Sequence, residues 1–173
     1  LIANHLMQKN ICVPPREENS KETKYEGAYV KEPIIGGHDW IVSFDINSLY
    51  PHIIIQYNIS PEKILGESSH GVNVNKMIDM KVPLNYLKTE GACLTPNGAK
   101  FRNDSQGFLP EMMEKMYNER VVFKQRMLKA KAEYQKTKDP KLVKEIARCH
   151  NIQWSKKIAL NSAYGAVGNQ YFR

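Results

Sequence analysis

Residues 136–140, Lys-Thr-Lys-Asp-Pro, decide the fold, because they separate two long runs of helical periodicity. In both runs apolar residues recur at intervals of three and four, the spacing of one helix face. The first run extends from Pro110 to about Lys136, and the second begins at Asp139-Pro140, a cap followed by a first-turn proline. Gly165 marks its expected end. We therefore predict two helices of about 25 residues in an antiparallel hairpin about 37 Å long.

Residues 40–46, Trp-Ile-Val-Ser-Phe-Asp-Ile, predict a strand. Their apolar residues alternate with others, which gives the strand one strongly apolar face, and we expect it to be well buried. The strand ends close to the carboxylate of Asp45. A short helix follows, with Asn47 or Ser48 as its cap and Pro51 in its first turn, where proline forfeits no intrahelical hydrogen bond.

A β-hairpin is expected further along, where residues 93–95 and 99–101 flank Pro96-Asn97-Gly98. Asn-Gly supplies the positive φ angles that a tight hairpin turn needs. With the helical hairpin, these strands place the chain in the α+β class.

The composition favours a polyanionic partner. The 173 residues include 25 lysines and arginines against 18 acidic residues, a net charge of +7, and this charge makes nucleic acid a better candidate than an acidic small molecule. The three cysteines are far apart, which argues against a disulfide framework and a zinc site and favours a reducing compartment such as the cytoplasm. No apolar run approaches the roughly 20 residues that span a bilayer, so no membrane is expected.

Asp45 is the first residue with a predicted chemical role. It stands where the strand meets a helix start, so its carboxylate would lie beside unpaired backbone N–H groups that attract phosphate. A metal ion on Asp45 could share that phosphate. The alternative is an aspartate that only caps the helix.

A second set of polar residues lies on the second long helix. Lys157, Asn161 and Tyr164 are spaced by four and then three residues, which places them in a stripe about 60° wide. The stripe carries a cation, an amide and a phenol. The alternative is an ordinary solvated face.

The strings around these residues resemble two motifs of family B DNA polymerases. Residues 45–52, Asp-Ile-Asn-Ser-Leu-Tyr-Pro-His, are similar to the first motif, DxxSLYPS, and depart from it at His52. Residues 157–165, Lys-Ile-Ala-Leu-Asn-Ser-Ala-Tyr-Gly, match the second motif, KxxxNSxYG, at every defined position and follow in the expected order. The resemblance, strongest to tailed-phage replicative enzymes, implies template-directed transfer of a nucleotide from a deoxynucleoside triphosphate to a primer 3′-hydroxyl in DNA replication.

The first motif implies roles for five residues. By resemblance, Asp45 binds both catalytic magnesium ions, and the backbone carbonyl of Ile46 helps to hold one of them. Ser48 and Leu49 cradle the triphosphate. Tyr50 is the sugar gate, whose ring would crowd a ribose 2′-hydroxyl.

The second motif implies the contacts of the long helix. Lys157 is expected to contact the phosphates as a catalytic residue, since an ammonium can neutralise charge on a pyrophosphate leaving group. Asn161 is expected beside the phosphates. Tyr164 and Gly165 are expected to abut the nascent base pair, and Tyr164 also to bind the nucleotide.

Two weaker resemblances add to this set. Residues 109–120 look like the start of the fingers helix of phage-type enzymes, which assigns Arg120 and Lys124 to a grip on the triphosphate. Near the start of the chain, Tyr25 and Gly27 fall in a segment similar to YxGG/A, which touches the template strand. A solvated basic stripe and a simple turn are the respective alternatives.

The resemblance implies a division of the chain into four parts. Residues 1–32 form a linker from the exonuclease region, 33–109 part of the palm, 110–165 the fingers hairpin, and 166–173 a return to the palm. The expected partners are primer–template DNA, a deoxynucleoside triphosphate and, in a full-length enzyme, a sliding clamp.

The third family motif, of the DTD type, is absent, because no Asp-x-Asp occurs in the sequence. Its carboxylate would complete a two-metal magnesium site with ions about 3.5–4 Å apart. The chain also starts without methionine and stops in an aromatic stretch, so we expect a fragment that is inactive by itself. The alternatives are a non-catalytic module that binds nucleic acid or nucleotide and, least in keeping with the motifs, a purely structural helical hairpin.

Overall fold

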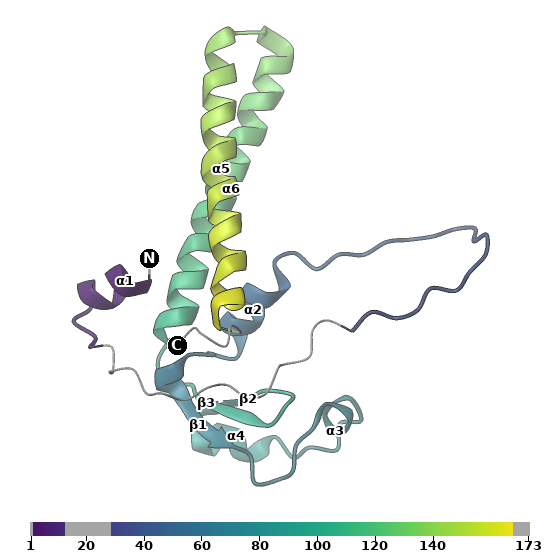
Figure 1. The fold of residues 1–173 in the computed structure, drawn as a ribbon, viewed down its shortest axis with the longest axis vertical. Coiled ribbons are helices and arrows are strands. Elements are labelled where there is room, and N and C mark those ends of the chain that lie inside the picture. The colour runs from purple at the N-terminus through teal and green to yellow at the C-terminus, as the bar shows by residue number, and fades with distance from the viewer. Residues whose placement is uncertain (1, 13–28, 168–173) are drawn as a thin grey trace.

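A computed structural model describes residues 2–12 and 29–167 of the chain (Figure 1). It is an α+β arrangement, as predicted. Tyr25 and Gly27 lie outside the described residues. In chain order the elements are α1 (Ile2–Gln8), α2 (Leu49–Gln56), the 3₁₀ helix η1 (Pro61–Lys63), β1 (Ile64–Glu67), α3 (Val74–Ile78), α4 (Asn85–Glu90), β2 (Ala92–Leu94), β3 (Ala99–Arg102), α5 (Phe108–Thr137) and α6 (Pro140–Val167).

The predicted helical hairpin is confirmed in α5 and α6, the tall pair in Figure 1. Lys138 closes α5 in the left-handed conformation, with φ 55°. The Asp139 carboxylate accepts a hydrogen bond of 2.9 Å from the backbone N–H of Lys141, so Asp139 caps α6 as expected and Pro140 is its first residue.

Both helices are longer than predicted, with 30 and 28 residues. Gly165 does not end α6, which continues through it to Val167, and the prediction of a stop there was wrong. A glycine within a helix costs only about 1 kcal/mol relative to alanine. Contacts of α6 with α5 and α2 along the hairpin offset that cost.

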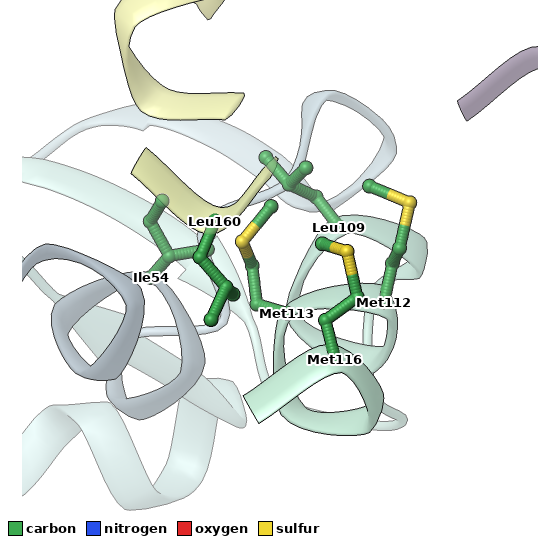
Figure 2. Packing of buried hydrophobic residues seen from close by; sticks show 6 residues of the cluster. All are labelled: Ile54, Leu109, Met112, Met113, Met116 and Leu160. Carbon is green, nitrogen blue, oxygen red and sulfur yellow. The ribbon is translucent and has the colours of Figure 1, made fainter. Parts of the chain in front are cut away.

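One core joins the foot of the hairpin to α2 (Figure 2). Three methionines of α5 contribute to it, and their flexible side chains fill the irregular space between three helices. Through Ile54, near the end of α2, this core fixes that helix relative to both long helices. Its buried residues are Ile54, Leu109, Met112, Met113, Met116 and Leu160.

A small antiparallel sheet of order β1-β3-β2 lies below the hairpin in Figure 1. It contains the predicted β-hairpin, in which Cys93 pairs with Phe101. The turn is looser than expected, because only Gly98 has a positive φ, of 93°, while Asn97 does not. The backbone N–H of Thr95 donates to the carbonyl of Ala99 and closes a loop of three residues, Pro96 to Gly98.

The strand predicted for residues 40–46 is absent, and this prediction was wrong. The segment is an irregular part of the arm that leaves the body on the right of Figure 1. Trp40 and Phe44 are 99% and 90% exposed. An alternating pattern predicts an apolar face, but a strand forms only where a neighbouring strand supplies hydrogen bonds, and none of the described residues does so.

In residues 2–12 and 29–167, no helix has the combination of length and apolar character that crossing a membrane requires.

Candidate functional site

Arg120 of α5 reaches the start of α2. Its Nη1 donates a hydrogen bond of 3.2 Å to the hydroxyl of Ser48, a residue 72 positions earlier. The Ser48 hydroxyl makes no hydrogen bond to the N–H groups of α2, so it occupies the predicted cap position without acting as a side-chain cap. Two residues assigned to the triphosphate by resemblance are thus brought into contact.

The backbone of Ser48 is left-handed, with φ 53° and ψ 45°. For a residue with a β-carbon this conformation costs on the order of 1–3 kcal/mol and is concentrated at ligand-binding sites. His52 stabilises it, because its Nδ1 lies 2.9 Å from the carbonyl oxygen of Ser48. That contact is a hydrogen bond when Nδ1 carries the proton.

His52 also reaches α5. Its ring meets the ring of Tyr117 edge to face, with centroids 4.6 Å apart and planes at 81°. The histidine that replaces the serine of the family motif therefore links the start of α2 to α5. The sequence marks this departure from the motif but gives no sign of its partner.

Tyr50 and Tyr164 connect the two motifs. Their rings are stacked, with centroids 4.5 Å apart and planes 24° from parallel. Tyr50 comes from the first turn of α2 and Tyr164 from the last turns of α6. The predicted sugar gate and the residue predicted at the base pair are therefore direct neighbours.

Ion pairing separates the cations of residues 108–128 and 145–167, the part of the hairpin below its far end, into two groups. Arg126 and Arg148 share Glu145, and Lys156 is paired with Glu119. Within the described residues no carboxylate pairs with the other four cations, and three of these are the predicted phosphate ligands. The four are Lys115, Arg120, Lys124 and Lys157.

The guanidinium of Arg120 is also incompletely hydrogen-bonded, because its buried Nε has no partner in the part of the chain that the structure describes. An unsatisfied buried donor costs about 1–3 kcal/mol. The group therefore favours an additional acceptor, such as an anion that repositions it.

The remaining residues of the second motif lie on α6 without contacts to the first. Lys157 is half-buried, with Nζ 4.9 Å from the centroid of the Trp154 ring. Asn161 and Gly165 are exposed. Because Tyr164 is two turns beyond Lys157, these side chains follow α6 over about 10 Å toward the Tyr50 stack.

Asp45 and Ile46 are not brought to the site. Both are exposed on the arm before α2, and Leu49 at the start of α2 is exposed as well. No group of three or more His, Cys, Asp or Glu side chains in residues 2–12 and 29–167 could hold a metal ion. The described residues therefore do not assemble a complete metal centre around Asp45.

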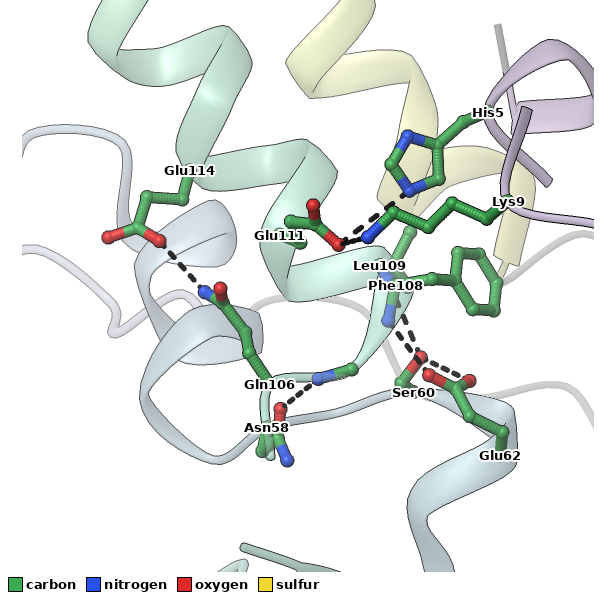
Figure 3. A network of polar contacts seen from close by, with 11 residues as sticks. His5, Lys9, Asn58, Ser60, Glu62, Gln106, Phe108, Leu109, Glu111 and Glu114 are labelled. Atoms are coloured by element: carbon green, nitrogen blue, oxygen red, sulfur yellow. Dashed lines mark hydrogen bonds and ion pairs between the residues drawn. The ribbon is translucent and has the colours of Figure 1, made fainter. Parts of the chain in front are cut away.

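The root of α5 is held by residues that the sequence did not single out (Figure 3). Three side chains after α2 accept from the unpaired backbone N–H groups of the helix start. Asn58 accepts from Gly107 at 2.8 Å, Glu62 from Phe108 at 2.8 Å, and Ser60 from Leu109 at 3.4 Å. These caps fix the base of the helix that carries Arg120.

Glu111, near the same root, anchors α1. Its carboxylate is hydrogen-bonded and ion-paired to Lys9, and His5 Nε2 lies 3.8 Å away (Figure 3). The hydrogen bond from Lys9 holds the pKa of the Glu111 carboxyl below its ordinary value. A groove lies between α1 and the hairpin, on residues such as Lys115 and Ser155, and is lined by none of the predicted site residues.

Comparison with known proteins shows the family of the chain. The family model for DNA polymerase family B matches residues 1–172, so the chain belongs to that family. It is 28% identical to the DNA-directed DNA polymerases of Escherichia phage RB69, over 214 residues, and Enterobacteria phage T4, over 215. All of this chain aligns in both cases, with 23% of each phage protein. The DNA polymerase delta catalytic subunit of Schizosaccharomyces pombe is 31% identical over 165 residues, 94% of this chain and 13% of that protein. The chain thus spans less than a quarter of the length of these relatives.

Proposed function

We propose that this chain supplies the nucleotide-binding part of a DNA-directed DNA polymerase that transfers a nucleotide from a deoxynucleoside triphosphate to a primer 3′-hydroxyl during replication. The contact between Arg120 and Ser48 carries the proposal. It joins the first motif to a cation that lacks a carboxylate partner in the described chain. The RB69 and T4 relatives carry the name of this activity.

In the proposed complex, Arg120 and Lys124 bind the phosphates from α5. The planar guanidinium of Arg120 offers two parallel N–H donors to phosphate oxygens, and Lys124, one helical turn further, adds a point charge. Ser48 and Leu49 meet the same phosphates at the start of α2. Lys157 neutralises the charge that develops on the pyrophosphate as it leaves, as a catalytic residue.

The tyrosine stack would place the sugar and the base. Tyr50 crowds the sugar at its 2′ position, and Tyr164 and Gly165 pack against the new base pair. Asn161 lies between Lys157 and Tyr164 along α6 and completes the polar stripe beside the phosphates. Because the two rings touch, the gate and the base-pair contact would respond together to an incoming nucleotide.

Magnesium is the proposed cofactor. The carboxylate of Asp45 and the carbonyl of Ile46 are oxygen ligands of the kind that magnesium prefers. A two-metal site needs a further carboxylate, which the described residues do not bring to Asp45.

The proposed partners and compartment follow from the activity. Primer–template DNA would bind with Tyr25 and Gly27 against the template, and a sliding clamp would act on the full-length enzyme. The cysteine usage suits a cytoplasm, that of the host for a viral enzyme.

Primer extension by the complete gene product, with magnesium present, tests the activity. Asp45→Asn should reduce extension by roughly 10²- to 10³-fold, because it removes the carboxylate expected to hold the magnesium ions. Asp39→Asn, a change of the same kind on the same exposed arm, should leave extension unchanged. Equal extension by wild type and Asp45→Asn would contradict the proposed role of Asp45.

A non-catalytic module that binds nucleic acid or nucleotide remains the second candidate, because the described residues do not complete a metal centre. It predicts binding without extension, both by the complete gene product and by this chain. Our proposal predicts extension by the gene product and none by the 173-residue chain with magnesium.

A further inference from the structure

The net charge of the chain is concentrated in the helical hairpin. Residues 108–167 contain thirteen lysines and arginines and six acidic residues, which accounts for the whole net charge of +7. The rest of the chain has twelve basic and twelve acidic residues and is neutral. A segregation of this kind identifies the hairpin as the polyanion-binding part of the molecule.

More than half of this charge lies at the far end of the hairpin, at the top of Figure 1. Residues 129–144 contain six lysines and only two acidic residues, Glu133 and Asp139. We call the six the basic tip. They are Lys129, Lys131, Lys136, Lys138, Lys141 and Lys144.

All six side chains of the basic tip are exposed. None of them forms an ion pair within residues 2–12 and 29–167. Immediately below, Arg126 and Arg148 are both ion-paired with Glu145. Like charges gathered without counter-charges repel one another and destabilise the hairpin, so its folding does not account for them.

The basic tip is too far from the nucleotide site to serve it. Arg120 and Lys136 are sixteen residues apart on α5, which corresponds to about 24 Å along the helix. A triphosphate held between Arg120 and Ser48 therefore does not extend to the tip. A polyanion on the basic tip would be a second ligand, separate from the triphosphate.

We propose that the basic tip binds the phosphate backbone of duplex DNA, about 24 Å along α5 from the nucleotide site. The choice of DNA among polyanions rests on the proposed function, whereas the position of the surface rests on the charges alone. Lysines act as point charges that follow a phosphate backbone without reading bases.

Duplex is favoured over single-stranded DNA because the tip lacks a stacking platform in the described chain. Surfaces for single strands combine basic residues with open aromatic rings. The aromatic ring at the tip, that of Tyr134, is half-buried and has Lys138 Nζ 5.5 Å from its centroid. Backbone contacts alone suit a duplex.

The test is fluorescence anisotropy of a labelled 20-base-pair duplex titrated with this chain over a range of salt concentrations. One variant changes Lys136, Lys138, Lys141 and Lys144 to glutamine. The control variant changes four exposed lysines outside the hairpin in the same way, so both lose the same charge. The control positions are Lys31, Lys76, Lys81 and Lys88.

Each phosphate contact contributes about 0.9 to the slope of log affinity against log salt. The tip variant should therefore lower the magnitude of that slope by about three to four, and the control variant by less than one. An equal effect of the two variants would overturn the proposal, because total charge would then explain the binding. A larger loss for a 20-nucleotide single strand than for the duplex, or equally tight binding of polyglutamate, would also overturn it.

Triphosphate binding separates this inference from the proposed function. The tip variant should bind dATP as the unsubstituted chain does, which also shows that it is folded. Arg120→Ala should lose dATP binding and keep the salt slope for duplex DNA. A loss of this salt dependence in Arg120→Ala would mean that the duplex binds at the nucleotide site. The proposal of a separate DNA-binding surface at the tip would then be overturned.

Discussion

Tyr50 of α2 stacks on Tyr164 of α6, with ring centroids 4.5 Å apart and planes 24° from parallel. Such a pair contributes about 0.5–1.5 kcal/mol beyond the area it buries. The stack holds the two motifs together although 114 positions separate them in the sequence. Tyr50 remains 48% exposed, so the pair leaves room for a third planar group or a sugar.

Tyr50→Ala should relax discrimination against ribonucleotides in the complete gene product. The substitution removes the ring that would crowd the 2′-hydroxyl and leaves Tyr164 without its stacking partner. The ratio of ribonucleotide to deoxynucleotide incorporation measures the effect and should rise at least tenfold, corresponding to about 1.4 kcal/mol. Tyr86→Ala is the control, because the Tyr86 ring contacts the ring of His70 and neither residue belongs to the two motifs. An unchanged ratio in Tyr50→Ala would remove the gate from our account.

Lys157→Ala should slow the chemical step by roughly 10²- to 10³-fold, because the charge on the leaving pyrophosphate would lose its cation. Single-turnover incorporation by the complete gene product is the measurement. Lys156→Ala provides an adjacent control, since Lys156 is paired with Glu119. If both variants retain the wild-type single-turnover rate, Lys157 has no part in the chemistry.

Gly107→Ala should destabilise the chain by about 1–3 kcal/mol, because a β-carbon there would lie 2.6 Å from the β-carbon of Ser60 at the root of α5. Urea unfolding followed by circular dichroism measures the change. Gly165→Ala is the matched control on the same hairpin, with nothing within 4 Å of the added carbon. It should be neutral or stabilising by up to about 1 kcal/mol. Equal stability of the two variants would show that the cap does not hold α5.

The helical hairpin could be predicted because its signals are local. The apolar spacing and the Asp139-Pro140 cap are properties of neighbouring residues, and both are observed. The motif residues could be assigned because their identities and order resemble a known family. The contact of Arg120 with Ser48 is consistent with that assignment but was not itself predictable.

Other features depend on residues far apart in the sequence. The strand expected at residues 40–46 needs a neighbour, and the described chain provides none. The caps of α5 come from side chains 46 to 49 positions earlier, which no local pattern indicates. The low helix propensity of Gly165 predicts a helix end there, but the packing of α6 against distant residues carries the helix on to Val167.

The contact of α1 with α5 should weaken in acid. The Lys9 hydrogen bond holds the pKa of Glu111 below its ordinary value of 4.5, with His5 and Lys115 also nearby. A lowered pKa in the folded state means that the contact stabilises α1 above about pH 4.5 and loses this effect as the pH falls through the folded-state value. The methyl NMR signals of Leu6, the buried residue of α1, report whether α1 remains packed against α5.

In that titration the Leu6 methyl signals should shift before those of Leu160 in the main core. Glu111→Gln should show a loosened α1 at pH 7 and no separate acid step. Simultaneous movement of both leucines, in wild type and variant alike, would show that the ion pair does not control α1.

The central claim is that Arg120 and Ser48 form part of a triphosphate site, and dATP binding to this chain tests it most directly. In a Trp40→Phe background Trp154 is the remaining tryptophan, and Lys157 Nζ lies 4.9 Å from its ring, so its fluorescence reports on the site. We predict a saturable change with dATP that weakens by roughly tenfold or more in Arg120→Ala, since a hydrogen bond to a charged group contributes about 1.5–3 kcal/mol. Arg126→Ala, which changes a cation already paired with Glu145, should bind as the background does. Equal dATP affinity in Arg120→Ala and the background would contradict the account.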